Sequence, residues 1–303
     1  MNPGNTHLFV GKGGVGKSTC STLFSLHMAD RGRSVLLDSM DPAHNLHDLL
    51  EISLNERPKR VIEGLRVRES DIAAQAAGRI KELRRELKGS YHHLQTLNIE
   101  RFIDIFRYAP GMEEHASLMV LERALSESRA DTVVIDTPPT ALTVKTLALP
   151  SVSLKWIEQL GAMRREILAK KLSVARIRRQ DQSKLREDRV LYRLVQMEER
   201  YRLLRSGLSD AERTHIHIVM NDDPLSLAES TQIQRQLVDL GLSAADIWVN
   251  RSSDLGCSDE IREAFPGQQI RILPQLAHPP VGITALRAML AEIEACGEEL
   301  PSE

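Results

Sequence analysis

The stretch that decides the fold of this chain is Gly11-Lys12-Gly13-Gly14-Val15-Gly16-Lys17-Ser18-Thr19. It matches the phosphate-loop pattern G-x-x-x-x-G-K-[ST] at every fixed position. The surrounding residues suit the motif, because His7–Val10 has the character of a short buried strand and Ser18–Asp30 that of a helix. In such a unit the backbone N–H groups of the loop and the helix N-terminus bind phosphate. We therefore predict a nucleotide site; a glycine-rich turn that matches by chance is the alternative.

Two side chains of this loop, and one further along the chain, are expected to supply the chemistry. Lys17 would reach the β- and γ-phosphates, and the Ser18 hydroxyl would bind Mg²⁺. Residues 131–136 are an apolar run that closes on Asp136. This carboxylate would bond a water on the ion or the Ser18 hydroxyl, since Mg²⁺ prefers oxygen ligands and keeps several waters. The predicted cofactors are a nucleoside triphosphate and Mg²⁺.

Apolar, β-rich runs alternate with helical patterns along the rest of the chain. The runs cover 34–38, 65–68, 131–136, 214–220, 247–250 and 269–273, and the helical patterns cover 71–87, 99–108, 113–126, 224–240 and 282–296. Strands that are apolar throughout are typical of parallel sheets covered on both faces. The sequence thus predicts an α/β fold, a P-loop NTPase with a mainly parallel sheet that helices cover on both faces.

Residues 151–210 depart from this alternation. They contain fifteen Lys and Arg against eight Asp and Glu, although the whole chain has a net charge of −2. Their apolar residues recur at helical spacing. We predict an inserted α-helical subdomain, made of about 70–128 and 151–210, within a single domain that covers 1–303. The positive charge fits a solvated helix face, and it also fits a surface for an acidic partner, anionic lipid or a client.

Composition excludes several classes of protein. The chain has 303 residues, of which 42% are hydrophobic and 27% charged, and its small net charge argues against nucleic-acid binding. It has no apolar run of the roughly 20 residues that a membrane helix needs and no secretory signal at its start, so we expect a cytoplasmic location. Cys20, Cys257 and Cys296 lie far apart, which predicts reduced thiols.

Six motifs in one order resemble the ArsA/Get family, which comprises arsenical-pump ATPases and ATPases that carry tail-anchored membrane proteins. Besides the loop at 11–19, they are Asp41-Pro42-Ala43-His44-Asn45, Pro110-Gly111-Met112-Glu113-Glu114, Asp136-Thr137-Pro138-Pro139-Thr140, Leu225-Ser226-Leu227-Ala228-Glu229 and Val249-Asn250-Arg251. They span nearly the whole chain. The resemblance implies that the nucleotide is ATP and that two copies of the chain form a homodimer.

The resemblance also assigns two catalytic roles. The loop is similar to the deviant Walker A loop of the MinD/ParA/ArsA class, in which the lysine at the position of Lys12 reaches the nucleotide of the partner subunit, as an arginine finger does in trans. Asp41 corresponds to the carboxylate that orients and deprotonates the attacking water. The alternative for Asp41 is a structural cap on the turn that follows it.

Three further residues correspond to nucleotide contacts in the family. Asn250 matches the asparagine that contacts the adenine edge, and an amide can both donate to and accept from that edge. Pro274 matches a residue that packs beside the base. Asp223 stands where the family has a glutamate that contacts nucleotide. The resemblance therefore adds Asn250, Pro274 and Asp223 to the predicted ATP site.

The sequence departs from the family at three places. The targeting ATPases share zinc through a C-x-x-C, but only Cys257 occurs in that region, so we expect no zinc site. The arsenical ATPases use a cysteine cluster that is missing here. Ala141 and Leu142 replace a Gly and a His of the family, and the double proline before them should stiffen this loop.

We predict a homodimeric Mg-ATP-hydrolysing switch whose hydrolysis rearranges the helical subdomain, for the targeting or chaperoning of tail-anchored membrane proteins. Its partners would be a second copy, a hydrophobic tail-anchored client and a membrane receptor. One alternative is the soluble ATPase subunit of an arsenite or other anion efflux pump. The other is an ATP-dependent dimerisation switch like ParA or MinD.

Overall fold

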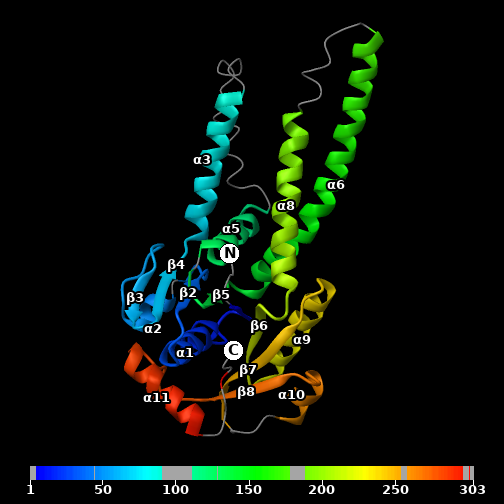
Figure 1. Cartoon of the computed structure of the whole chain (residues 1–303). Helices are drawn as coiled ribbons and strands as arrows, with labels where there is room; N and C mark the ends of the chain where they lie inside the picture. The colour runs from blue at the N-terminus through cyan, green and yellow to red at the C-terminus, as the bar shows by residue number, and fades with distance from the viewer. Residues whose placement is uncertain are drawn as a thin grey trace. The chain divides into compact units, whose positions relative to one another are not determined.

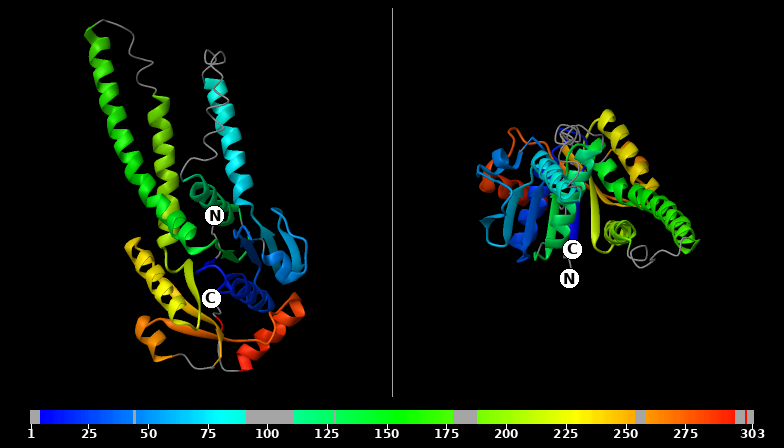
Figure 2. Two further views of the ribbon diagram at one scale, coloured as in Figure 1. Left: turned by 180° about the vertical axis from the view of Figure 1, so that it is seen from behind. Right: turned by 90° about the horizontal axis from the view of Figure 1, so that it is seen from above.

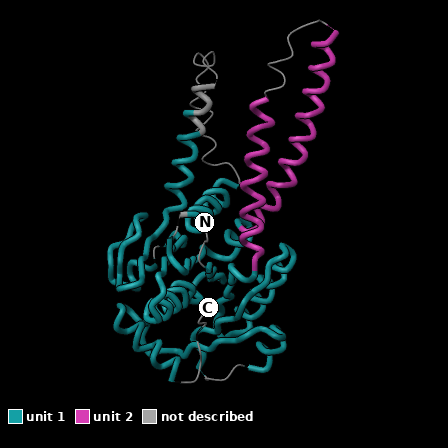
Figure 3. The backbone as a smooth tube through the Cα atoms, in the orientation of Figure 1, with its two compact units in different colours: residues 1–146, 211–303 teal, residues 147–210 magenta. Residues whose placement is uncertain are grey.

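The computed structural model of the chain describes residues 5–43, 45–90, 111–127, 129–177, 188–253, 258–295 and 300 (Figure 1). The predicted helix at 99–108, together with His44, Pro110, Cys257 and Cys296, lies outside these residues. The chain divides into two compact units, residues 1–146 with 211–303 and residues 147–210 (Figure 3).

The first unit contains an eight-stranded sheet, counted over the described residues, in the order β3-β4-β2-β5-β1-β6-β7-β8. Its strands are β1 (Asn5–Val10), β2 (Val35–Ser39), β3 (Lys59–Ile62), β4 (Leu65–Glu69), β5 (Thr132–Asp136), β6 (Thr214–Asn221), β7 (Ala244–Ser252) and β8 (Gln269–Pro274). All neighbouring strands are parallel except β3 and β4. The predicted α/β fold with a mainly parallel sheet is confirmed.

Strand β3 is absent from the sequence-based prediction, because it lacks the pattern that marks the others. Its residues are exposed or half-buried, and it pairs antiparallel with β4 at the edge of the sheet. Its side chains need not form an apolar run, since none of them is buried, whereas β8 at the opposite edge buries three residues and does carry such a run.

Seven helices of the described residues belong to the first unit. They are α1 (Lys17–Asp30), α2 (Asn45–Leu50), α3 (Ile72–Ser90), α5 (Met112–Glu127), α9 (Pro224–Asp239), α10 (Asp259–Ala264) and α11 (Gly282–Ala295). Helices α3 and α5, which we predicted to join the helical subdomain, pack against each other and fall in the unit of the sheet. The extent of the subdomain over 70–128 stays a prediction.

Both faces of the sheet are buried. On one face Phe9 and Val134 join Phe24 of α1 and Leu286 of α11 in a single apolar cluster. The alternate strand residues point to the opposite face and are buried as well; they include Leu8, Val133, Ile135 and Ile218. Helices α5 and α9 contact β5 and β6. Figure 2 shows helices on either side of the sheet of this unit.

The second unit consists of residues 147–177 of the long helix α6 (Thr140–Ile177) and of α8 (Arg189–Ser209). Asp188 joins them, because its Oδ2 accepts from Arg164 Nη2 at 2.6 Å while its Oδ1 caps α8 by accepting from Leu191 N at 2.7 Å. The hydrogen bond from Arg164 lowers the pKa of Asp188 to about 2.

None of the described helices combines the length and the apolar character that a membrane span requires.

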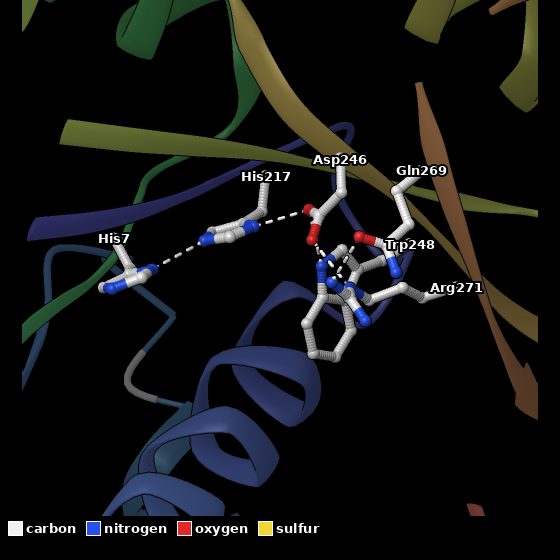
Figure 4. Close-up of polar contacts among 6 residues, drawn as sticks. All are labelled: His7, His217, Asp246, Trp248, Gln269 and Arg271. Atoms are coloured by element: carbon white, nitrogen blue, oxygen red, sulfur yellow. Dashed lines mark hydrogen bonds and ion pairs between the residues drawn. The ribbon is translucent and has the colours of Figure 1, made fainter. Parts of the chain in front are cut away.

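A chain of buried polar side chains crosses the sheet beneath α1 (Figure 4). His7 Nδ1 lies 2.9 Å from His217 Nε2, and His217 Nδ1 lies 2.5 Å from Asp246 Oδ1. Trp248 Nε1 donates to the same oxygen of Asp246 at 2.9 Å, and Arg271 Nε donates to the other at 2.7 Å. Four strands thus share one hydrogen-bonded network, in which the Asp246 charge has cationic and neutral donors around it.

His7, at one end of this network, is disfavoured from taking up a proton. Burial lowers the pKa of His7 well below its usual range, and the neighbouring His217 and His215 lower it further. His215, which stacks on His7, also has a lowered pKa because of burial. Below the ordinary histidine pKa the unfolded chain therefore binds protons that the folded chain does not, so stability falls as the pH falls.

We expect the free energy of unfolding to decrease between pH 7.5 and pH 5.5, by about 1.4 kcal/mol per pH unit for each such histidine below about pH 6.5. His7→Gln, which cannot titrate, should show a shallower slope in urea unfolding measured across this range. The buried carboxyl of Asp136, whose pKa burial raises to about 6, is common to both proteins, so its titration cancels in the difference. Exposed His278→Gln is the matched control and should keep the wild-type slope. Equal slopes for wild type and His7→Gln would contradict the assignment.

Candidate functional site

The predicted phosphate loop follows β1 at the centre of the sheet and leads into α1. A close approach and a left-handed backbone conformation explain two of its glycines. A Cβ on Gly11 would lie 2.3 Å from the Val219 carbonyl oxygen, and Gly16 has a φ of 93° as the N-cap of α1. Gly16 supplies no capping side chain, so the first turn of α1 presents backbone N–H groups at the loop. This is the arrangement that binds phosphate oxygens.

Asn250 braces the loop from β7. Its Nδ2 donates to the Val15 carbonyl oxygen at 2.8 Å, and the amide is buried. A Cβ on Gly16 would lie 2.1 Å from the same nitrogen. The structure therefore brings Asn250 to the loop, as expected of a nucleotide-site residue, and it gives this side chain a structural contact that sequence reasoning did not predict.

Lys17 lies inside the loop with only 4% of its surface exposed. Its Nζ donates to the Lys12 carbonyl oxygen at 3.1 Å. Burial lowers the pKa of Lys17, and the charges of Asp136 and Asp41 oppose that effect. The Lys17 ammonium group has lost most of its hydration by burial. A bound phosphate would restore hydrogen bonds and negative charge to it, so this position suits phosphate binding.

Asp136 is the most buried charge of the site. Its Oδ2 accepts from Ser18 Oγ at 2.7 Å and from Ser39 Oγ at 3.0 Å, while its Oδ1 has no partner among the described residues. Burial raises the pKa of this carboxyl to about 6, although the bond from Ser18 and the charge of Lys17 act against the shift. The pair of Ser18 hydroxyl and unpartnered carboxylate oxygen fits Mg²⁺ with its waters.

Asp41 lies in the loop after β2. Its Oδ1 accepts from Ala43 N at 3.0 Å, and its own N–H donates to Ser39 Oγ at 3.3 Å. The capping contact that we gave as the alternative role of Asp41 is thus present. Its charge also acts to raise the pKa of Asp136 and that of Lys17, which places it in the same electrostatic environment.

Lys12 makes an ion pair within its own chain. Its Nζ lies 2.7 Å from Glu229 Oε1 on α9, and the two side chains are 46% and 34% exposed. An ion pair this exposed contributes only about 0–1 kcal/mol. Lys12 is therefore held near the loop by a contact that it can exchange for a stronger one.

The remaining predicted residues lie at the carboxyl ends of β6 and β8. Asp223 is exposed and caps α9, because its Oδ1 accepts from Ser226 N at 2.8 Å. Pro274 ends β8, where it pairs with Ser252 of β7. Between Val249 and Ser252 the ladder is irregular, and Arg251 has a φ of 58°. Strained backbone of this kind is frequent at binding sites.

Three residues of the site were assigned no role from the sequence, although Glu229 belongs to one of the six motifs. Ser39 binds Asp136, Glu229 holds Lys12, and Asn221, paired in register with Asn250, has a buried Oδ1 with no partner among the described residues. Ser39 and Asn221 each follow a predicted strand and adjoin an aspartate, which is a usable signal because ligands bind beyond strand ends. Nothing in the sequence joins Glu229 to Lys12.

The described residues offer no metal site of histidines, cysteines and carboxylates. Cys20 is fully buried in α1, and burial raises the pKa of its thiol, which keeps it protonated. The predicted lack of a zinc site involves Cys257, which lies outside the described residues, so it stays a prediction.

Comparison with known proteins gives relatives along most of the chain. Residues 5–261 match the family model described as anion-transporting ATPase. Putative arsenical pump-driving ATPase 1 of Aquifex aeolicus is 28% identical over 251 residues, which are 80% of this chain and 62% of that protein. Putative arsenical pump-driving ATPase 2 of the same organism is 27% identical over 306 residues, 96% and 94% of the two chains. ATPase GET3A of Arabidopsis thaliana is 26% identical over 241 residues, 80% and 65%.

The contact between Gly16 and Asn250 can be tested by adding a single methyl group. Gly14 and Gly16 both have positive φ, but only Gly16 has a neighbour within reach of a Cβ. Gly14→Ala should cost about 1–2 kcal/mol of stability from backbone strain, and Gly16→Ala about 1 kcal/mol more because the Asn250 bond is lost. Urea unfolding measures both. In an Asn250→Ala background the two costs should become equal; a persisting difference would rule out the contact.

Proposed function

The chain belongs to the anion-transporting ATPase family, a family of ATP-hydrolysing enzymes, and from this premise we propose that it is a homodimeric switch driven by Mg-ATP. The observation that carries the proposal is the buried carboxylate of Asp136 with the Ser18 hydroxyl and Lys17 around it. Such a cluster is costly for a chain that binds no cation and no phosphate, because burial penalises each charge.

The residues of the loop divide the work of binding ATP. The backbone N–H groups of Gly13 to Thr19 would surround the phosphates, and Lys17 would contact the β- and γ-phosphates. Ser18 and Asp136 would hold Mg²⁺ and one of its waters, and the bound ion would neutralise charge on those phosphates. Asn250, Pro274 and Asp223 would line the adenine end of the site, where the carboxyl ends of β6, β7 and β8 lie together.

Asp41 would act on the attacking water. A carboxylate at this place can accept the proton of the water and align it with the γ-phosphate. The contact with Ala43 N fixes one oxygen of Asp41 and sets the direction of the other. The capping role and the catalytic role are therefore compatible, since they use different oxygens.

Lys12 would complete the site of a second copy of the chain. It would exchange the Glu229 carboxylate of its own chain for the phosphates bound to the partner, where a cation stabilises the charge that develops in the transition state. A chain with one phosphate loop obtains such a cation in trans only by pairing, which supports the homodimer.

Hydrolysis would be coupled to the helices of the second unit through the end of β5. Only residues 137–139 separate Asp136 from the first residue of α6, and Thr143 Oγ1 donates to the Pro138 carbonyl oxygen at 2.7 Å. The same helix continues into the second unit. A change at Asp136 would thus reach α6 along a short, proline-stiffened connection.

We propose membrane-protein targeting as the biological role, because α8 of the second unit exposes large apolar side chains such as Val195 and Leu203. The names of the Aquifex aeolicus relatives favour pump driving instead. A metalloid would need thiolates, and the chain has three cysteines, of which Cys20 is buried and protonated. Stimulation of the ATPase rate by antimonite would decide for the pump, and retention of a tail-anchored protein in solution would decide for targeting.

Asp41→Asn should bind Mg-ATP normally and lose turnover by about 10²–10⁴-fold, the usual contribution of a general base. The amide oxygen that this substitution introduces can still accept from Ala43 N, so the loop should keep its shape. Fluorescent-nucleotide binding and phosphate release measure the two effects separately. Asp48→Asn, an exposed change in α2, is the control. Wild-type turnover of Asp41→Asn would remove Asp41 from the mechanism.

Lys12→Ala should bind ATP within the monomer but lose about 10³-fold in turnover, because the cation supplied in trans is gone. Glu229→Gln removes only the charge that holds Lys12 in its own chain, so this variant should keep turnover. Phosphate release is followed over a range of protein concentrations, with sedimentation to measure dimerisation. If Lys12→Ala hydrolyses ATP at the wild-type rate and dimerises normally, Lys12 does not act across the dimer.

A further inference from the structure

One face of α6 in the second unit is apolar and exposed over most of its length. Its residues, which we call the α6 stripe, are Val152, Trp156, Leu160, Met163, Ile167 and Val174, and their exposed fractions lie between 37% and 66%. They recur at intervals of three, four and seven, so they share one side of the helix. The α6 stripe extends for about 33 Å at 1.5 Å per residue.

The α6 stripe is distinct from the face that α6 buries. Ile157 and Ala175 are almost fully buried, and each lies about a quarter turn or more from the line of the stripe. The helix is therefore apolar on two sides, of which one is already covered. A folded chain leaves a stripe of this size exposed when something else binds there.

The charges beside the α6 stripe distinguish between its possible occupants. Three lysines on the exposed surface of α6 accompany the stripe: Lys170 lies within it, Lys171 lies beside it, and Lys155 lies about a quarter turn from its line, on the side opposite Ile157. Of the acids near them, Glu166 pairs with Lys170 at 2.7 Å, and Glu158 lies on the side of the helix away from the stripe. A second copy of α6 would bring lysines against lysines, and an apolar client helix offers no acid to pair with them. An anionic bilayer offers apolar chains and negative headgroups together.

We propose that the α6 stripe docks on an anionic lipid bilayer, with α6 lying along the surface. The apolar side chains enter the boundary between headgroups and acyl chains, Trp156 lies at the headgroup level where tryptophan is enriched, and the lysines contact lipid phosphates. Residues 151–210 contain fifteen basic and eight acidic residues, and this net positive charge attracts the unit to a negatively charged bilayer surface. This docking requires neither ATP hydrolysis nor a client.

The two tryptophans make the proposal directly measurable. Trp248 is fully buried and Trp156 is 66% exposed, so a change of tryptophan emission on vesicle binding reports Trp156. We expect a blue shift and co-flotation with vesicles of phosphatidylcholine and phosphatidylglycerol in equal parts. Vesicles of phosphatidylcholine alone should bind at least about tenfold more weakly, because the lysines lose their partners. Trp156→Phe should float but lose the shift.

Two variants separate the apolar and the charged contributions. Leu160→Ser with Ile167→Ser keeps Trp156 and should weaken binding by about tenfold or more. Replacing Lys155, Lys170 and Lys171 together by Gln should weaken binding about a hundredfold, judged from the known effect of each basic residue near an anionic surface. The controls are Val238→Ser and Arg60→Gln, which change exposed residues of the first unit and should bind as wild type does.

Three outcomes would overturn the proposal. They are absence of flotation with the anionic vesicles, equal binding to both kinds of vesicle, and wild-type binding by the variant with both serine substitutions. A blue shift with a soluble apolar helical peptide, in a protein that does not bind anionic vesicles, would assign the α6 stripe to a client helix. That result would leave the targeting role standing, whereas loss of ATPase activity in Lys12→Ala leaves the vesicle assay unaffected.

Discussion

A carboxylate that is buried away from solvent must be stabilised by hydrogen-bond donors and opposite charges of the protein. For Asp136, three elements of the chain together provide this stabilisation. Strand β5 delivers it, Ser18 at the start of α1 and Ser39 at the end of β2 donate to it, and Lys17 supplies the opposite charge. These donors reach one point only because β5 lies between β1 and β2 in the sheet. The strand order is thus inseparable from the site, since a different order would leave the charge unpaired.

This dependence explains which residues of the site could be predicted from the sequence. The loop at 11–19 and Asp136 are recognisable because the spacing of a phosphate loop is fixed by the phosphate that it binds, and because an apolar run that ends in an acid is visible locally. Ser39 and Glu229 join the site only through tertiary contacts, which the local sequence does not reveal. Ser39 depends on the neighbour that β5 takes, and Glu229 on the place of α9 beside the loop.

The same distinction applies to the fold. Strands with buried side chains carry apolar runs, so β1, β2 and β4 to β8 could be predicted, while β3, whose side chains are exposed or half-buried, could not. The polar network from His7 to Arg271 was also invisible, because each member looks like a single polar residue within an apolar strand. Only pairing of β1, β6, β7 and β8 makes these residues neighbours. Buried polar groups are acceptable where they satisfy one another, and that is a property of register.

For helix α6 the sequence predicts the element but not which of its faces is buried. Helical spacing of apolar residues predicts a helix whichever side is covered, so the sequence cannot tell a buried face from an exposed one. Here Ile157 and Ala175 are covered while Trp156 and Met163 are not, and Lys170 and Lys171 lie on the exposed side. Burial alone would select for neither a charge bias nor an exposed tryptophan on that side. A helix that differs from a simple core helix in both respects is adapted to bind a second surface. The lysines on its exposed side indicate that this surface is negatively charged.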